Sequence, residues 1–208
     1  MTRTGAPVNV APKIVFLSGS LSGNSKTGRI ADWCAAHCAR YRAVTRVFRG
    51  TDLEFPFYRH GGAADHGPEI HDYLRAMEQA DAVVLVSPAY HGAVSGLLKN
   101  AIDYVNELTG PDRPLLDGRA IGCVAVARGE QGAASTLGML RTIGHALRGW
   151  PTPLGVALSN DQALVDGTGM PVAERTRAQL QVMLGQVVSH STLSARRRAA
   201  RTPAGTRP

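Results

Sequence analysis

Residues 16 to 32, FLSGSLSGNSKTGRIAD, lead from an apolar run into a helical pattern through a loop rich in hydroxyl side chains. The start of a helix attracts anions, because its first backbone N–H groups are unpaired and the helix dipole is positive there. Hydroxyl, amide and ammonium side chains add further donors. The segment therefore predicts a binding site for a phosphate group. The expected ligands are Ser18, Ser20, Ser22, Asn24, Ser25, Lys26 and Thr27.

Three other interpretations of this loop compete with the phosphate site. An ordinary helix N-cap is the first, although a single serine would satisfy a cap. The second is a P-loop for a nucleoside triphosphate, but Ser20 and Ser25 replace both glycines that let a P-loop backbone wrap the phosphates. The third is a dinucleotide fingerprint, for which the glycines have the wrong spacing. We therefore expect one phosphate, held without a metal ion.

Cys34, His37 and Cys38 form a second group that could do chemistry, since their spacing places them on one side of a helix. A metal ion would need further ligands, and no second ligand pair stands elsewhere in the sequence. We therefore expect the two cysteines to pack in the core. With Cys123 they make an odd number of cysteines, which is typical of a reducing compartment rather than of a disulfide framework.

These residues must be positioned by elements that alternate along the chain. Apolar runs without polar alternation predict buried strands, and the segments between them have helical spacing. Alternation of this kind predicts a doubly wound α/β domain, a flavodoxin-like five-stranded parallel sheet in the order 2-1-3-4-5 with helices on both faces. The expected strands are 14–17, 44–48, 82–86, 120–127 and 153–158, and the expected helices are 25–40, 69–79, 97–108, 133–147 and 172–194.

The chain of 208 residues suits one such domain. We expect it to span residues 13–195, between a flexible N-terminus at 1–12 and a disordered basic tail at 196–208. The net charge is +7, and the last 18 residues hold five arginines and no acid; subtracting those five charges leaves +2 for the rest. The tail could bind nucleic acid or anionic lipid, but a solvated terminus is the favoured interpretation.

Membrane insertion and secretion are not expected from the sequence. The longest apolar run, residues 82–86, is far too short to span a bilayer. The first 12 residues have no apolar core of the kind that a secretory signal needs. We therefore expect a cytoplasmic protein.

The most specific stretch is residues 81–105, DAVVLVSPAYHGAVSGLLKNAIDYV, which resembles the NADPH-dependent FMN reductase family. That family has S-P-x-Y-x-G followed by G-x-L-K-N-A-x-D. The matching residues are Ser87, Pro88, Tyr90, Gly92, Gly96, Leu98, Lys99, Asn100, Ala101 and Asp103. The family's first loop, G-S-x-R-x-x-S, is matched by Gly19, Ser20 and Ser25, with Ser22 where arginine is usual. The resemblance covers about residues 13–190 and includes the proline-containing segment 52–58.

The resemblance implies noncovalently bound FMN and a hydride transfer from NADPH or NADH to the flavin, then to free flavin, a quinone or another small acceptor. No catalytic side chain is implied, because the cofactor carries the chemistry. It also implies a homodimer or tetramer. Lys26 is the candidate to replace the missing arginine. Flavin-binding residues are expected in the loops after the third and fourth strands: Pro88, Ala89, Tyr90, His91 and Gly92, then Arg128, Gly129 and Gly132.

Several alternatives stay open at this point. A flavodoxin-type electron carrier would share the FMN site without oxidising NAD(P)H. A catalytically silent flavin-fold protein could use its basic tail to recruit a partner. Arg128 could stabilise charge on a reduced flavin or a nucleotide phosphate, or form a surface ion pair with Glu130. The residues Lys99, Asn100 and Asp103 could contact a ligand, support their helix or contact another subunit.

Overall fold

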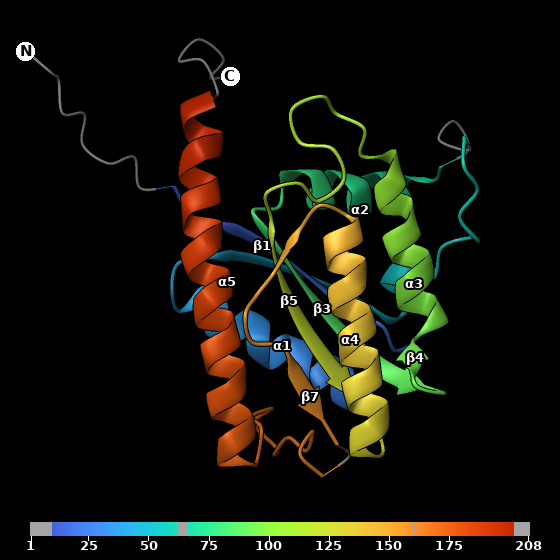
Figure 1. Ribbon diagram of the computed structural model, residues 1–208, viewed down its shortest axis with the longest axis vertical. Coiled ribbons are helices and arrows are strands. Elements are labelled where there is room, and N and C mark those ends of the chain that lie inside the picture. The colour runs from blue at the N-terminus through green and yellow to red at the C-terminus, as the bar shows by residue number, and fades with distance from the viewer. Residues whose placement is uncertain (1–9, 62–65, 160, 202–208) are drawn as a thin grey trace, which may run out of the picture.

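The computed structural model describes residues 10–61, 66–159 and 161–201. Its parallel sheet has the strand order β2-β1-β3-β5, and two short strands, β6 and β7, both pair with β5. This arrangement confirms the predicted flavodoxin-like order (Figure 1). The strands are β1 (Lys13–Ser18), β2 (Val44–Arg49), β3 (Ala82–Tyr90), β4 (Ala93–Val94), β5 (Ala120–Val126), β6 (Trp150–Pro151) and β7 (Val156–Leu158).

Helices cover both faces of the sheet, and this explains why the central strands β1, β3 and β5 are largely apolar and buried. On β1, Ile14 and Phe16 belong to one core cluster, while Val15 and Leu17 belong to the other. The first cluster lies under α1 and α5, and the second under α2, α3 and α4. The helices are α1 (Lys26–Ala39), α2 (Pro68–Gln79), α3 (Gly96–Asp103), α4 (Glu130–Ala146) and α5 (Glu174–Arg201), with 3-10 turns at Gly50–Leu53 and Tyr104–Glu107.

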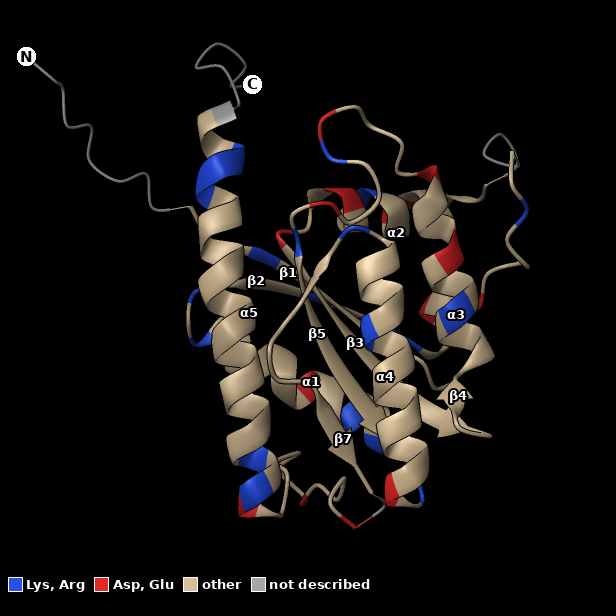
Figure 2. Ribbon diagram, viewed as in Figure 1, with Lys and Arg blue, Asp and Glu red and all other residues tan. Residues whose placement is uncertain are grey.

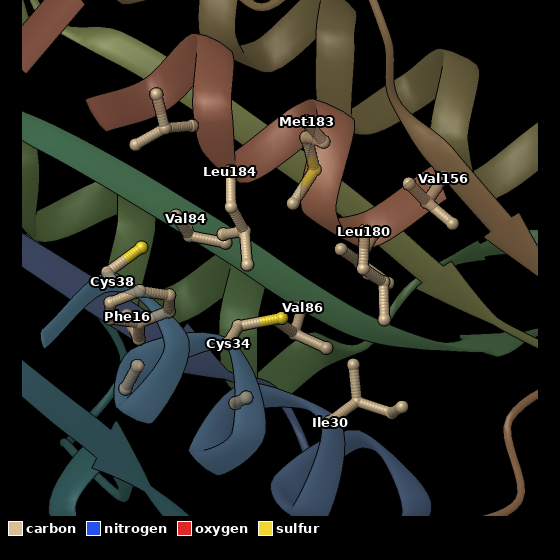
Figure 3. Packing of buried hydrophobic residues seen from close by; sticks show 14 of the residues in the cluster. Phe16, Ile30, Cys34, Cys38, Val84, Val86, Val156, Leu180, Met183 and Leu184 are labelled. Carbon is tan, nitrogen blue, oxygen red and sulfur yellow. The ribbon is translucent and has the colours of Figure 1, made fainter. Parts of the chain in front are cut away.

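Both cysteines of α1 point into the first cluster, as predicted (Figure 3). Cys34 and Cys38 are fully buried among Phe16, Val84 and Leu184. Burial raises the pKa of Cys38 to about 12, so its thiol stays protonated and behaves as a small apolar group. Among the described residues, no group of His, Cys, Asp and Glu side chains is arranged to hold a metal ion.

Two predicted boundaries differ in ways that matter for the site. The loop expected after residue 86 is instead a β-hairpin, because β3 continues to Tyr90 and pairs with the antiparallel strand β4. The fifth strand, expected at 153–158, is shortened to β7 at 156–158, and the separate strand β6 precedes it at 150–151. Between them Thr152 turns inward, and its hydroxyl donates to the carbonyl of Leu154 at 2.8 Å.

The prediction of a disordered tail from residue 196 is wrong for the described part of that segment. The helix α5 runs to Arg201, and Arg198 donates to the Asp81 carboxylate at 2.8 and 3.1 Å. Asp81 is fully buried and also accepts from the backbone N–H of Lys13, so a buried charge anchors the end of the helix. Figure 2 shows that Lys and Arg are concentrated near the C-terminal end of α5. Residues 202–208 lie outside the described residues.

A buried arginine stabilises the same end of the sheet, the one at which Asp81 binds Arg198. The guanidinium of Arg119 is fully buried and donates to three backbone carbonyls, those of Glu78, Ala80 and Leu115, at 2.8 to 3.0 Å. Burial and the nearby Arg113 lower the pKa of Arg119 to about 10. At the N-terminus, residues 1–9 of the segment expected to be flexible lie outside the described residues. Pro12, by contrast, is buried and accepts from the N–H of Val44 at 2.8 Å.

No described helix is both long and apolar enough to cross a membrane.

Candidate flavin site at the carboxyl end of the sheet

The first loop leaves β1 and packs directly against the second. The backbone N–H of Gly19 donates to the carbonyl of Val86 on the neighbouring strand at 2.9 Å. A Cβ at Gly19 would lie 2.4 Å from the hydroxyl oxygen of Ser95 and 2.8 Å from the Cβ of Leu98. Only glycine therefore lets the first loop approach the start of α3 this closely, and the loops after β1 and β3 meet as a result.

The hydroxyls at the start of α1 divide into two groups. Ser25 is the N-cap of the helix, because its Oγ accepts from the N–H of Gly28 at 3.0 Å. The hydroxyl of Thr27 is buried and donates to the same oxygen at 3.2 Å. The ordinary capping interpretation thus holds for this pair. It does not account for the serines that precede them.

Ser20 and Ser22 line a cleft of about 360 Å³ beside the start of α1. The Oγ of Ser20 accepts from the N–H of Ser22 at 3.3 Å, and Ser22 and Asn24 are exposed. The Oγ of Ser18 is fully buried and has no hydrogen-bond partner among the described residues. The cleft is lined by Ser20, Leu21, Ser22, Gly23, Ser25 and Gly28, and across from them by Arg49, Gly50, Thr51 and Asp52.

The second loop is the tip of the β3–β4 hairpin. His91 and Gly92 form its turn with φ of 55° and 78°, the left-handed geometry that suits a two-residue hairpin turn. The hydroxyl of Ser135 on α4 donates to the carbonyl of Gly92 at 2.9 Å and fixes the tip. Pro88 and Ala89 are half-buried, while Tyr90 and His91 are exposed. The hairpin therefore presents two rings at the edge of the sheet on a fixed backbone.

The third loop, between β5 and α4, borders the hairpin. Arg128 and Gly129 are exposed immediately before the helix begins. A Cβ at Gly132 would lie 3.5 Å from the Cβ of Ala127 and 4.0 Å from that of Ala89, so this loop and the second pack against each other. Among the ion pairs of the described residues, none joins Arg128 to Glu130.

Asn100, which belongs to the G-x-L-K-N-A-x-D pattern, holds the segment 55–58 in place. Its side-chain amide donates to the carbonyls of Phe55 and Pro56, and its oxygen accepts from the N–H of Tyr58, all within 2.9 to 3.1 Å. Phe57, held at the centre of this braced segment, is 88% exposed. The neighbouring Lys99 and Asp103 form an ion pair with each other on the surface of α3.

Sequence reasoning missed Arg49. This residue ends β2, lines the cleft opposite the serines and forms an ion pair with Asp32 of α1. The only sequence signal was an arginine at the carboxyl end of a predicted strand, next to the expected phosphate loop. Lys26, the cation that the sequence favoured, is not among the described residues that line the cleft.

A larger cavity, of about 1010 Å³, lies at the opposite end of the sheet. Its lining includes Arg113 and Arg198 together with Glu78, Asp112 and Asp117, so it carries both signs of charge. Glu78 and Arg198 in its lining are also the partners of Arg119 and Asp81 in the buried interactions that hold the end of α5 and the sheet together. Doubly wound sheets bind their ligands at the carboxyl ends of the strands, which is where the smaller cleft lies.

The sequence profile described as NADPH-dependent FMN reductase matches residues 12–163, which include all three loops. NADPH-dependent FMN reductase ArsH of Acidithiobacillus ferrooxidans is 29% identical over 147 residues, 70% of this chain and 59% of the relative. FMN-dependent NADPH-azoreductase of Staphylococcus aureus is 26% identical over 184 residues, 85% of this chain and 94% of the relative.

Solved structures show the same fold. FerB, a flavoenzyme NAD(P)H:(acceptor) oxidoreductase from Paracoccus denitrificans, superposes with a TM-score of 0.66 at 20% identity, covering 88% of this chain and 99% of that one. The chain spans less than two thirds of the length of the ArsH relatives, but nearly the whole of the azoreductase. The hydroxyl-rich first loop, the hairpin with its S-P-x-Y-x-G sequence and the profile match all agree, and the chain belongs to the NADPH-dependent FMN reductase family.

Proposed function

We propose that the protein binds FMN noncovalently where the three loops meet and uses it to oxidise NADPH or NADH. Electrons would pass on to a small acceptor such as free flavin, a quinone or an azo compound. The observation that carries this proposal is the convergence of the hydroxyl loop, the hairpin and the loop before α4 at the carboxyl ends of β1, β3 and β5. The site offers groups suited to the phosphate end and to the ring end of FMN.

The phosphate end suits the first loop. Ser20, Ser22 and Asn24 offer side-chain donors in front of α1, whose N-terminus favours an anion. The buried Ser18 hydroxyl, which has no partner among the described residues, is a further donor beneath the loop. Ser25 and Thr27 contribute by holding the first turn of the helix in place. A monophosphate is a better match than a triphosphate, because this loop lacks the glycines of a P-loop.

The ring end suits the hairpin and the third loop. Pro88 and the turn at His91 and Gly92 fix a backbone edge on which a flat ring can rest, and Tyr90 stands beside it. Gly129 before α4 and Gly132 in its first turn carry no side chains, so they leave space beside the hairpin for a ring. FMN, when bound, supplies the hydride and electron chemistry, so these residues need only hold it and shape the space above it.

Two exposed side chains can act on the substrates. Arg128 carries a positive charge at the third loop, suited to a reduced flavin or to a nucleotide phosphate. His91 is exposed at the hairpin tip, where its imidazole is placed to donate a hydrogen bond or a proton to an acceptor oxygen. We therefore expect His91→Ala to slow electron transfer to a quinone more than oxidation of NADPH, as stopped-flow measurement of each half-reaction would show.

The visible spectrum of the purified protein tests the proposal. We expect a yellow flavoprotein, after FMN is added if necessary, that bleaches when NADPH is added without oxygen and recovers when a quinone is added. A yellow protein that does not bleach with either nucleotide would contradict the enzyme and favour an electron carrier. A protein that never binds FMN would contradict the flavin site itself.

We further propose that the active form is a homodimer, or a dimer of such dimers, and that it works in the cytoplasm. Phe57 supports the first point, since a large apolar side chain is held out to solvent on a segment that Asn100 braces with three hydrogen bonds. Light scattering on the parent and on Phe57→Ser measures the assembly. We expect a multimer that Phe57→Ser weakens; a parent monomer would contradict the proposal.

A further inference from the structure

The cleft beside α1 has several hydroxyls but little positive charge, although an FMN phosphate is a dianion near neutral pH. Its lining includes four side chains that can donate from a hydroxyl, those of Ser20, Ser22, Ser25 and Thr51. Arg49 is the one Lys or Arg among the described residues that line it. Asp52, the acid in the same lining, accepts from the backbone N–H of Arg49 at 3.2 Å and thereby caps the short turn that follows.

The position of Arg49 follows from strand alternation. Val47 packs against the core under α1, whereas Phe48 belongs to the cluster on the opposite face, so Arg49 returns to the α1 face. Its ion pair with Asp32 on α1 agrees with this placement. Arg49 is also the cross-strand partner of Ser18, whose buried hydroxyl has no hydrogen-bond partner among the described residues. By the same alternation Ser18 lies on the face of Ile14 and Phe16, beneath α1.

We propose that Arg49 supplies the positive charge for the phosphate of FMN and that Asp32 weakens this attraction by pairing with it. This inference rests on the proposed FMN site. The side chains of Arg49 and Asp32 are 50% and 42% exposed, and ion pairs in such surroundings are weak. A phosphate dianion can therefore share the guanidinium or take it from Asp32, with a charge-assisted hydrogen bond as the gain.

The two members of the pair should then act in opposite directions. Arg49→Ala removes the attraction, whereas Asp32→Asn keeps the arginine and removes its competitor. If the ion pair between β2 and α1 were purely structural, both substitutions would instead weaken FMN binding. The sign of the Asp32→Asn effect therefore separates an electrostatic role from a structural one.

The experiment compares the dissociation constants of FMN and riboflavin, which differ by the phosphate, measured by quenching of flavin fluorescence. We expect Arg49→Ala to weaken FMN about tenfold while riboflavin stays unchanged. We expect Asp32→Asn to tighten FMN about twofold to threefold. The matched controls are Arg46→Ala and Asp72→Asn, because Arg46 on the same strand forms an exposed ion pair with Asp72 of α2, away from the cleft. Neither control should change the ratio of the two constants.

Thermal unfolding of each variant verifies that the fold persists. Equal loss of FMN and riboflavin binding in Arg49→Ala, or no loss of either, would overturn the inference while leaving the FMN site intact. So would loss of phosphate selectivity in Lys26→Ala or Arg29→Ala instead. If the parent protein bound neither flavin, the proposed function would fail, and this inference with it.

Discussion

The two ends of the sheet use their polar residues in opposite ways. At the amino ends of the strands, Asp81 and Arg119 are fully buried, and their side chains form hydrogen bonds with other parts of the chain. At the carboxyl ends, Ser22, Tyr90 and His91 are exposed. Both ends also carry exposed polar groups, but the fully buried charged side chains of the described residues lie at the amino ends.

This difference separates stability from binding. A buried charge must be paired or hydrogen-bonded within the fold, because losing one partner leaves the other unsatisfied. Exposed hydroxyls and rings contribute little to folding and are available for a ligand. We therefore expect substitutions at the amino ends to lower the free energy of unfolding without altering flavin affinity, and substitutions at the carboxyl ends to do the reverse.

The largest effect should come from Arg119→Ala. The substitution removes three hydrogen bonds to the carbonyls of Glu78, Ala80 and Leu115 and leaves a cavity. We expect the free energy of unfolding to fall by about 3 to 5 kcal/mol. Urea denaturation measures this loss, and Arg119→Lys, which keeps the charge, should lose less. A weaker FMN affinity in the folded fraction of Arg119→Ala would contradict the assignment of stability to the amino ends and of binding to the carboxyl ends.

At the carboxyl end, the double substitution Ser20→Ala and Ser25→Ala should weaken FMN binding about a hundredfold, because Ser20 loses a hydrogen bond to a charged group, worth about 1.5 to 3 kcal/mol, and Ser25 loses the cap, worth about 1 kcal/mol, that holds the phosphate-binding turn. Fluorescence titration measures the affinity. Ser25 also caps α1, so the variant Ser25→Asn, which retains a good cap, separates lost helix stability from lost phosphate contacts. An unchanged dissociation constant in the double variant would move the phosphate away from this loop.

FMN binding and reduction should depend more on the backbone geometry of the hairpin than on the hydroxyl of Tyr90. Gly92 has φ of 78°, where a β-branched residue is strained by about 1 to 3 kcal/mol. We expect Gly92→Val to displace the hairpin tip and weaken FMN binding about tenfold. Tyr90→Phe should keep most of the rate of flavin reduction by NADPH, because hydride transfer needs no proton donor. Stopped-flow traces showing the opposite ranking would remove the hairpin as the flavin platform.

The smallest effect concerns the end of α5. Arg198→Ala breaks the ion pair with the buried Asp81, which keeps the hydrogen bond from the N–H of Lys13. We expect a loss of about 1 to 2 kcal/mol in stability and no change in FMN affinity. Arg196→Ala, two positions earlier and exposed, is the matched control and should change neither. A loss of NADPH oxidation in folded Arg198→Ala would show that the end of α5 reaches an active site.

The parts of the fold that depend on local sequence pattern could be predicted. Uninterrupted apolar runs such as 82–86 require cover on both faces, and this gave the strand order and the three loops at one edge. Pro88 obscured the hairpin, since proline usually ends a strand. Here it ends the pairing of β3 with β5, and the chain then turns back through His91 and Gly92.

Contacts between distant residues could not be predicted in this way. Arg198 is ordered by Asp81, which lies 117 positions away, so a run of arginines looked like a solvated tail. Arg49 reaches the cleft only because alternation on β2 turns it toward α1. Ser25 and Thr27 were correctly assigned to the first turn of the helix, but their use in capping rather than as free donors follows from geometry.

Hydrogen–deuterium exchange with and without FMN tests most directly which end of the sheet binds the ligand. We predict that FMN slows exchange in residues 19–28, 88–95 and 127–132, where backbone N–H groups surround the proposed site. Peptides covering 78–81, 113–119 and 196–201 should exchange at the same rate in both states. Protection confined to those amino-end peptides, with none in the three loops, would contradict the assignment of the flavin site.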